Sequence, residues 1–365
     1  MTEHVVILAG GKSQLPYVRE FQNRGWRVTV VDRDEHAIAR DSADTFIANS
    51  TYCLDTLIEK LTPENKAHQI STVFSNSSAG PVARNVAELN CVFNSKYSSF
   101  SLTSVDRCYS KAKMRECLVN SQVNVADAFT LESLNAEHFP IVIKPSHNGI
   151  GGFGVSKIES LASLNTLNLQ DKPHEWLYES YIDGDEYSVD GIMVNGELEI
   201  ISLCRKVSGE SRNDFLPNRF ELIPLQNMTA YNEIAKQSSL AANALDIDNS
   251  QISLDIKIDH RSTVTVIECG IFWDSKIDRL WEYSGFNGYG YFIDRLFRNQ
   301  DIDNKIALGS AAMEILYSDK EQILNEPEIL AQYPNSRIEF EKHSGELIRP
   351  PTSVADMIGC RFYQN

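Results

Sequence analysis

The first ninety residues alternate between short apolar runs and segments with helical spacing. Val5–Ala9 is an uninterrupted apolar run that ends at Gly10-Gly11. Residues 14–25 carry apolar side chains at helical intervals, and Trp26–Asp32 is again strand-like. A strand, a helix and a second strand in this order form a βαβ unit, which predicts a parallel sheet. Further predicted elements extend this unit to a doubly wound α/β domain: strands at 45–48 and 70–75, and helices at 53–61 and 80–89.

The pattern changes near residue 98, where strands begin to follow one another directly. The turn signal Asn195-Gly196 joins two strand-like runs and predicts a tight hairpin. The other predicted strands are 139–145, 176–182, 186–193, 251–257 and 262–268, and the predicted helices are 110–120, 229–244 and 290–298. The fold class is therefore α/β first and α+β afterwards. We expect three domains, at residues 1–97, 98–183 and 184–365.

Composition narrows the class of protein. The chain has 365 residues, is 42% hydrophobic and carries a net charge of −16, so a nucleic-acid partner is not expected. Its apolar runs are too short to span a bilayer, and Met1–His4 lacks a cationic signal-peptide start. The seven cysteines form no Cys-x-x-Cys pair and the eight histidines are scattered, which makes a zinc site improbable. We expect a cytoplasmic protein with no membrane partner.

The Gly10-Gly11 turn has the position of a dinucleotide-binding loop but not its pattern. A Gly-x-Gly-x-x-Gly fingerprint is missing, since Lys12, Ser13 and Gln14 follow Gly11. Asp32 stands where a ribose-binding acid would sit, although an acid there is also an ordinary loop residue. A simple strand–helix turn is favoured over a nicotinamide site.

The centre of the chain has a pattern that is typical of phosphate binding. Lys144 closes an apolar strand and is followed by a segment rich in glycine, from Gly149 to Gly154. Small residues let backbone N–H groups approach phosphate oxygens, and the lysine adds a cation. The segment is not a Walker loop, and taken alone it favours a flexible hairpin over a phosphate-binding loop.

Two pairs of carboxylates follow this segment. Glu179 and Glu186 flank a connector that can offer backbone groups to a base and a carboxylate to a ribose. Asp255 and Glu268 lie on adjacent strand-like runs with a turn near 259–262, so the two acids can face one another across a hairpin. Paired oxygen ligands of this kind suit Mg²⁺ bound together with phosphates.

Taken together and in order, these segments resemble the ATP-grasp superfamily of carboxylate–amine ligases. The resemblance is carried by Ser110–Arg115, by Ile143–Pro145 with its glycine loop, by Glu179–Glu186, and by Leu254–Lys257 followed by Val266–Glu268. It covers roughly residues 1–300, with residues 1–95 similar to the family's N-terminal domain. The fold it implies is an N-terminal doubly wound pre-ATP-grasp domain followed by a two-subdomain ATP-grasp fold.

The resemblance also implies a role for each matching residue. Lys111 and Lys144 would hold the ATP phosphates, under a lid that includes Gly149, Gly151 and Gly152. Glu179 and Ile182 would contact adenine, and Glu186 the ribose. Asp255 and Glu268 would hold two Mg²⁺ ions. A homodimer is a further expectation that comes from the family alone.

The chain departs from the family after its second metal acid. The family pattern Glu-x-Asn-x-Arg is replaced by Glu268-Cys269-Gly270-Ile271-Phe272. Asp274 is a candidate for the missing ligand, and Lys276, Arg279 or Arg205 for the missing cation. We predict Arg205 and Lys276 as catalytic residues, Arg205 for the acyl phosphate or the tetrahedral oxyanion. Cys269 is expected to face the core.

The function that follows is an ATP-dependent ligase that activates a small carboxylate, an amino acid or a sugar acid, and joins it to an amine. Three alternatives stay open at this point: a carboxylase-type member that activates bicarbonate, a nucleotide-binding relative without catalysis, and a nicotinamide dehydrogenase. The aromatic segment 281–291 is an acceptor pocket or a loop cap.

Overall fold

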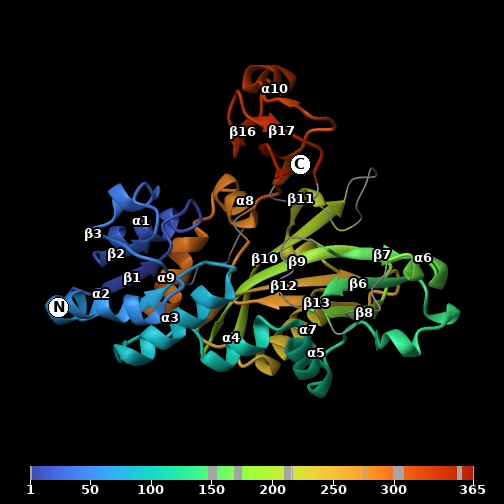
Figure 1. Cartoon of the computed structure of the whole chain (residues 1–365), viewed down its shortest axis with the longest axis horizontal. Coiled ribbons are helices and arrows are strands. Elements are labelled where there is room, and N and C mark those ends of the chain that lie inside the picture. The colour runs from blue at the N-terminus through green and yellow to red at the C-terminus, as the bar shows by residue number, and fades with distance from the viewer. Residues whose placement is uncertain are drawn as a thin grey trace.

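The computed structural model of the chain describes residues 2–146, 154–167, 175–208, 215, 217–274, 276–298, 308–351 and 356–364. Three larger β-sheets and a fourth sheet of two strands organise these residues (Figure 1). The N-terminal domain is blue in Figure 1, and a small green sheet lies on the far side of the large central sheet. The residues near the C-terminus form a lobe that projects from the top of the view.

The N-terminal sheet is parallel, with strand order β3-β2-β1-β4. Its strands are β1 (His4–Leu8), β2 (Arg27–Asp32), β3 (Thr45–Ala48) and β4 (Thr72–Phe74). Helix α1 (Leu15–Asn23) packs with Val5 and Ile7, while α2 (Leu54–Ala67) and α3 (Gly80–Val92) pack in the cluster that contains Val6 and Leu8. Successive strand residues point to opposite faces, so helices cover both faces of the sheet. The predicted doubly wound domain is confirmed.

The small sheet is antiparallel, with order β5-β8-β6-β7. Its strands are β5 (Ala128–Phe129), β6 (Ile141–Pro145), β7 (Ser156–Ile158) and β8 (Trp176–Ser180). It has its own core, which includes Ile141, Ile143 and Tyr178, and helix α6 (Leu161–Asn165) contributes Leu164 to it. Helices α4 (Leu102–Cys108) and α5 (Lys111–Asn120) precede this sheet in the chain.

The large sheet has eight antiparallel strands in the order β13-β12-β9-β10-β11-β14-β18-β16. Their bounds are β9 (Asp185–Val194), β10 (Glu197–Ser208), β11 (Pro217–Ile223), β12 (Ser250–Ile258), β13 (Val264–Gly270), β14 (Ala312–Leu316), β16 (Arg337–Phe340) and β18 (Gly359–Tyr363). Strands β9 and β10 meet at Asn195 and Gly196, whose φ angles of 53° and 80° are those of a type I′ turn. The predicted hairpin is confirmed, and so is the pairing of β12 with β13.

The two faces of the large sheet have different neighbours. Helix α7 (Tyr231–Ala244) covers one face through Ile234 and Ala241. The other face meets the N-terminal domain and the helices α8 (Ile277–Tyr283) and α9 (Gly288–Phe297). Short elements complete the C-terminal lobe: β15 (Gln322–Ile323), α10 (Glu326–Gln332) and β17 (Leu347–Ile348).

Helix α9 returns the chain to the N-terminal domain. The rings of Tyr17 and Tyr289 lie 4.9 Å apart, and those of Phe21 and Phe297 lie 5.5 Å apart. Trp281 and Tyr289 are buried in this contact. The aromatic segment 281–291 therefore contributes to the core between α1 and α9. In the described part of the chain, no helix combines the length and apolarity needed to cross a membrane.

Candidate active site

A cleft of about 1310 Å³ opens where the three sheets meet. Its walls come from the loops after β1 and β4, from the start of α5, from the small sheet and from one face of the large sheet. Most of the residues predicted for the site lie on these walls: Lys111, Lys144, Glu179, Ile182, Glu186, Asp255, Glu268 and Lys276. Segments that are far apart in the sequence are thus brought to one place.

Cross-strand rows on the large sheet explain how its polar residues come together. Directly paired residues on neighbouring strands share a face, and so do residues two positions on. One row is Cys204, Ser188, Asp255 and Glu268, read from β10 to β13. The next row holds Lys206, Glu186 and Lys257, and the row on the other side holds Ser202, Asp190, Ser253 and Gly270. The facing of Asp255 and Glu268, expected from the hairpin, is confirmed.

Lys206 is the cation at the centre of these rows. Its Nζ lies 2.5 Å from Asp255 Oδ1 and 3.5 Å from a carboxylate oxygen of Glu186. Burial on its own would lower the pKa of Lys206, but Asp255 and Glu186 outweigh burial and raise it. For Asp255, burial and the neighbouring acids Glu186 and Glu268 outweigh the pairing with Lys206 and raise its pKa to about 6.

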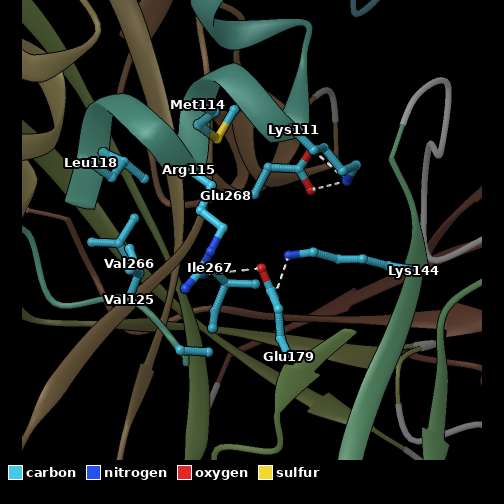
Figure 2. A pocket seen from close by; sticks show the side chains of 11 residues that line it. Lys111, Met114, Arg115, Leu118, Val125, Lys144, Glu179, Val266, Ile267 and Glu268 are labelled. Atoms are coloured by element: carbon cyan, nitrogen blue, oxygen red, sulfur yellow. Dashed lines mark hydrogen bonds and ion pairs between the residues drawn. The ribbon is translucent and has the colours of Figure 1, made fainter. Parts of the chain in front are cut away.

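The second metal-site candidate, Glu268, is held by Lys111. Ser110 caps helix α5 by accepting a hydrogen bond from the backbone N–H of Lys113, which fixes the start of the helix at Lys111. From there Lys111 Nζ donates to both carboxylate oxygens of Glu268, at 3.0 Å each (Figure 2). The Glu268 side chain is 45% exposed, so this pair is open to the cleft and to any ligand in it.

A second ion cluster lies below this pair in Figure 2. Lys144 Nζ lies 2.7 Å from one oxygen of Glu179, and Arg115 from α5 lies 3.3 Å from the other. Lys144 and Glu179 are each 8% exposed. A buried carboxylate needs such partners, because an unpaired charge is costly to desolvate. The cluster ties α5 to the small sheet beside Ile267, in a pocket lined by both.

The connector between β8 and β9 carries Ile182. Its carbonyl oxygen accepts a hydrogen bond of 3.2 Å from Lys257 Nζ, and the same Lys257 lies 5.0 Å from the centre of the Tyr181 ring. The connector is therefore anchored to β12 of the large sheet. The predicted lid residues Gly149, Gly151 and Gly152 lie outside the described residues.

Arg205 does not reach the cleft. It pairs with Tyr187 of β9 and Glu221 of β11, on the face opposite Lys206, and its guanidinium lies 2.8 Å from Asp185. The reason is a β-bulge between Ile200 and Ser202. Without it, the register of the hairpin would pair Arg205 with Glu186; one extra residue in β10 puts Lys206 there and turns Arg205 away.

Of the other candidates for the residues missing at positions 270 and 272, two line the cleft and one lies at the C-terminal lobe. Lys276 and Asp274 line the cleft, and Lys276 Nζ lies 2.8 Å from Asp274 Oδ1. Burial on its own raises the pKa of Asp274, but Lys276 outweighs it and the pKa is lowered. Arg279 instead pairs with Glu341 of the C-terminal lobe, at 2.7 Å.

Phe272 lies against Gly270, the residue that replaces the family's asparagine. A Cβ built on Gly270 would stand 2.9 Å from Phe272 Cε1, so the ring fills the space next to the glycine. Both residues line the cleft. Cys269, which precedes Gly270, is 1% exposed and packs in the core, as expected.

Sequence reasoning missed Lys206, Arg115 and Asp190. Lys206 follows Arg205 directly, but only the bulge decides which of the two faces the cleft. Arg115 belongs to the same helix as Lys111 and is one turn further on, a spacing that could have indicated it. Asp190 is fully buried, and a single acid in an apolar strand gave no separate signal.

The carboxylates present fit Mg²⁺ bound with a phosphate ligand. Asp255 and Glu268 offer hard oxygen atoms from one cross-strand pair. Among the described residues, no group of three or more histidine, cysteine or acidic side chains forms a closed metal cage. Mg²⁺ commonly uses one or two carboxylates and completes its shell with water and phosphate oxygens, so two facing acids are a sufficient protein contribution.

The loop after β1 is fixed by hydrogen bonds to the side chain of Asp32. Gly10 N–H donates to Asp32 Oδ2 at 2.7 Å, and Asp34 N–H donates to Asp32 Oδ1 at 2.9 Å. A Cβ on Gly10 would stand 2.9 Å from the Cβ of Ala37, so the turn needs glycine there. Asp32 thus orders a strand–helix turn, the role favoured from the sequence.

Comparison with known proteins finds a family model that matches the middle of the chain. Residues 137–271 match the model of the ATP-grasp domain, and this range holds Lys144, Glu179, Asp255 and Glu268. No curated protein sequence matches the chain.

Solved structures match over almost the whole length. L-amino acid ligase from Bacillus licheniformis has a TM-score of 0.81 at 17% identity, covering 99% of this chain and 93% of that one. N5-carboxyaminoimidazole synthetase from Staphylococcus aureus complexed with ADP has a TM-score of 0.75 at 15% identity, covering 100% and 94%. Biotin carboxylase from Campylobacter jejuni has a TM-score of 0.70 at 14% identity, covering 100% and 88%. The chain thus contains an ATP-grasp domain and has the ATP-grasp fold from end to end.

Proposed function

We propose that the protein is an ATP-dependent ligase that activates a small carboxylate and joins it to an amine. The observation that carries this proposal is the facing pair of Asp255 and Glu268 in the cleft, each held by a lysine. Because each acid is neutralised by a lysine, Mg²⁺ can take the place of the lysine ammonium groups as the partner of the two carboxylates. Magnesium and phosphate groups together can replace the lysine contacts without leaving a charge unpaired.

The nucleotide would lie between the small sheet and the large one. Lys111 and Lys144 would bind its phosphates, Glu179 and Ile182 would contact adenine, and Glu186 would contact the ribose. Ile267, which lines both the cleft and the smaller pocket beside it, supplies an apolar surface for the base. The glycines 149, 151 and 152 would close over the phosphates.

The metal sites would be Asp255 and Glu268, with Mg²⁺ neutralising phosphate charge when it is bound. The residues of the chain itself would position the substrates and neutralise the charge of the phosphates. In the reaction, a carboxylate oxygen attacks the γ-phosphorus of ATP and ADP leaves, which gives an acyl phosphate. An amine then attacks the acyl carbon and phosphate leaves, which forms the amide.

Lys206 and Lys276 are the cations placed to stabilise negative charge in this cleft. Both line it, whereas Arg205 lies on the other face of the sheet. A preorganised cation in a partly buried site stabilises a developing oxyanion strongly, because it needs no reorganisation. We therefore assign to Lys206 the role that the sequence suggested for Arg205, and we keep Lys276 as predicted.

The second half of the cleft would receive the carboxylate and the amine. It is bordered by the loops after β1 and β4, which leave neighbouring parallel strands at their carboxyl ends. Such edges of α/β sheets are common ligand sites. Ser13, Gln14, Asn76, Ser77 and Ser78 give this end polar, uncharged walls.

The test is phosphate release from Mg-ATP in the presence of pooled amino acids or sugar acids with amine donors, with products identified by mass. An adduct lighter by one water than its two substrates, formed with ADP, is the expected result. Bicarbonate with each amine is a separate arm, since the neighbours include a biotin carboxylase. Asp255→Ala and Glu268→Ala should abolish turnover.

Nucleotide binding without turnover in every arm would instead support the non-catalytic alternative. The observation that favours this alternative is Phe272, which fills the space beside Gly270 where the family has a polar ligand. A homodimer of two such chains stays a prediction, to be checked by light scattering.

A further inference from the structure

Asp190 is a buried acid on the strand next to the cleft-lining residue Ser253. It lies on β9 and is fully buried. Ser202 Oγ donates to its Oδ2 at 3.4 Å, while Oδ1 has no hydrogen-bond partner among the described residues. A buried carboxyl oxygen without a partner costs free energy, so a role for it in the molecule is expected.

The cross-strand row connects Asp190 to the cleft through Ser253. Asp190 pairs directly with Ser253 of β12, and Ser253 pairs with Gly270 of β13. Ser253 and Gly270 both line the cleft, whereas Asp190 lies one strand behind them. Although the Phe272 ring fills the space next to Gly270, Ser253 still borders the cleft.

This row is adjacent to the proposed reaction centre. Ser253 is two residues from Asp255 on the same strand and the same face, and its Oγ lies 3.3 Å from Ser188 Oγ. Ser253 therefore shares a face with the buried Asp190 on one side and with Asp255, beside which the acyl phosphate would form, on the other. A hydroxyl can accept a proton on one lone pair while it donates its own.

We propose that Ser253 and Asp190 accept the proton of the amine substrate, with Ser253 touching the amine and Asp190 acting through it. The inference rests on the proposed ligase function. The substrate ammonium gives a proton to Ser253 Oγ as the Ser253 hydroxyl proton passes to Asp190. The neutral amine attacks the acyl carbon and the C–N bond forms; the C–O bond to phosphate breaks, and phosphate leaves as hydrogen phosphate with the second proton of the amine nitrogen. Asp190 later returns its proton to water by the same route.

The charges around Asp190 suit this task. Burial is the main cause that raises the pKa of Asp190, to about 7; Asp274 and Asp255 raise it further, while Ser253 and Lys206 lower it. A proton acceptor works best when its pKa is near the working pH. Asp274, one of these neighbouring acids, is itself paired with Lys276.

The test compares Asp190→Asn with wild type using two nucleophiles. Asparagine reproduces the shape and neutral charge of a protonated aspartic acid, so a purely structural role would survive the change. If Asp190 accepts the proton, kcat with the amine should fall about a hundredfold or more, with KM for ATP and carboxylate unchanged. Hydroxylamine is largely unprotonated at neutral pH and needs no proton acceptor before it attacks, so hydroxamate formation should stay near the wild-type rate.

Ser253 and Ser202 provide the matched controls. Ser253→Ala should lose activity with the amine and keep hydroxamate formation, and Ser253→Thr, which keeps a hydroxyl, should recover most of the loss. Ser202→Ala, on the side of Asp190 away from the cleft, should stay within about threefold of wild type.

Two results would overturn the proposal: an Asp190→Asn enzyme as fast as wild type with the amine, or an equal loss with both nucleophiles. If wild type forms no ADP with any carboxylate and no hydroxamate, the ligase function itself fails, which is a different outcome from either.

Discussion

Lys206 Nζ and Asp255 Oδ1 lie 2.5 Å apart on strands separated by β9, so a lysine occupies the position where a metal ion is expected to bind. Glu186 lies 3.5 Å from the same Nζ and belongs to the strand between them. Lys206 and a Mg²⁺ ion from solution would therefore compete for the same carboxylate, Asp255. The competition between them can be measured without any knowledge of the substrate.

Lys206→Met is expected to destabilise the protein and to sharpen its response to magnesium. Removing Lys206 leaves the partly buried Asp255, whose side chain is 31% exposed, without its cation, at a cost of about 2 kcal/mol. Added Mg²⁺ should restore part of that loss, because it can neutralise Asp255 in place of the lysine. Thermal unfolding with and without millimolar Mg²⁺ checks this, with Arg205→Met as the control on the opposite face. Equal Mg²⁺ responses in wild type and Lys206→Met would contradict the idea.

Lys111→Met separates stability from nucleotide binding. Its partner Glu268 is 45% exposed, so the ion pair should contribute less than about 1 kcal/mol to the free energy of unfolding. If Lys111 binds phosphates, its removal should nevertheless weaken ATP binding at least about tenfold. Calorimetric titration with Mg-ATP and urea denaturation measure the two quantities. Lys236→Met, an exposed lysine on α7, should change neither.

The order of the elements could be predicted because each rests on local pattern. The βαβ start, the Asn195-Gly196 hairpin and the facing of Asp255 with Glu268 all follow from periodicity and turn chemistry over short stretches. These features place most of the candidate site residues on the cleft. The family resemblance then supplied roles that pattern alone could not.

The choice between Arg205 and Lys206 could not be made from the sequence. It depends on one extra residue at Ile200–Ser202, which shifts the register of β10 and exchanges the two side chains between faces. The role of Asp190 could not be predicted from the sequence for a related reason. Its importance lies in neighbours from β10 and β12, which only the assembled sheet brings beside it.

Gly270→Ala and Phe272→Ala should be coupled. A Cβ at position 270 would stand 2.9 Å from the Phe272 ring, so the alanine forces the ring to move, at a cost of about 1 kcal/mol. With Phe272→Ala already in place, the same alanine should cost almost nothing. A double-mutant cycle of urea denaturation measures the difference. Additive effects would mean that the ring moves freely and does not fill that space in solution.

Asp190→Asn should remove one component of the pH dependence of stability. The folded-state pKa of Asp190 is about 7, well above the ordinary value of 3.8 expected in the unfolded chain. Between these values the folded protein holds a proton that the unfolded chain has lost, so the free energy of unfolding falls as pH rises. The fall amounts to about 1.4 kcal/mol per pH unit, about 4 kcal/mol in all, and stops near pH 7. Asparagine cannot ionise, so the Asp190→Asn variant should have about the same free energy of unfolding as wild type near pH 4 and a higher one at pH 8. Asp255 titrates with the same sign in both proteins, so it does not reverse the direction of the difference. Urea denaturation at unit steps from pH 4 to pH 8 measures the difference, with the exposed Asp319→Asn as control. Parallel curves for wild type and Asp190→Asn would show that Asp190 stays ionised in the fold, and a proton acceptor at that position would then have to be charged throughout the neutral range.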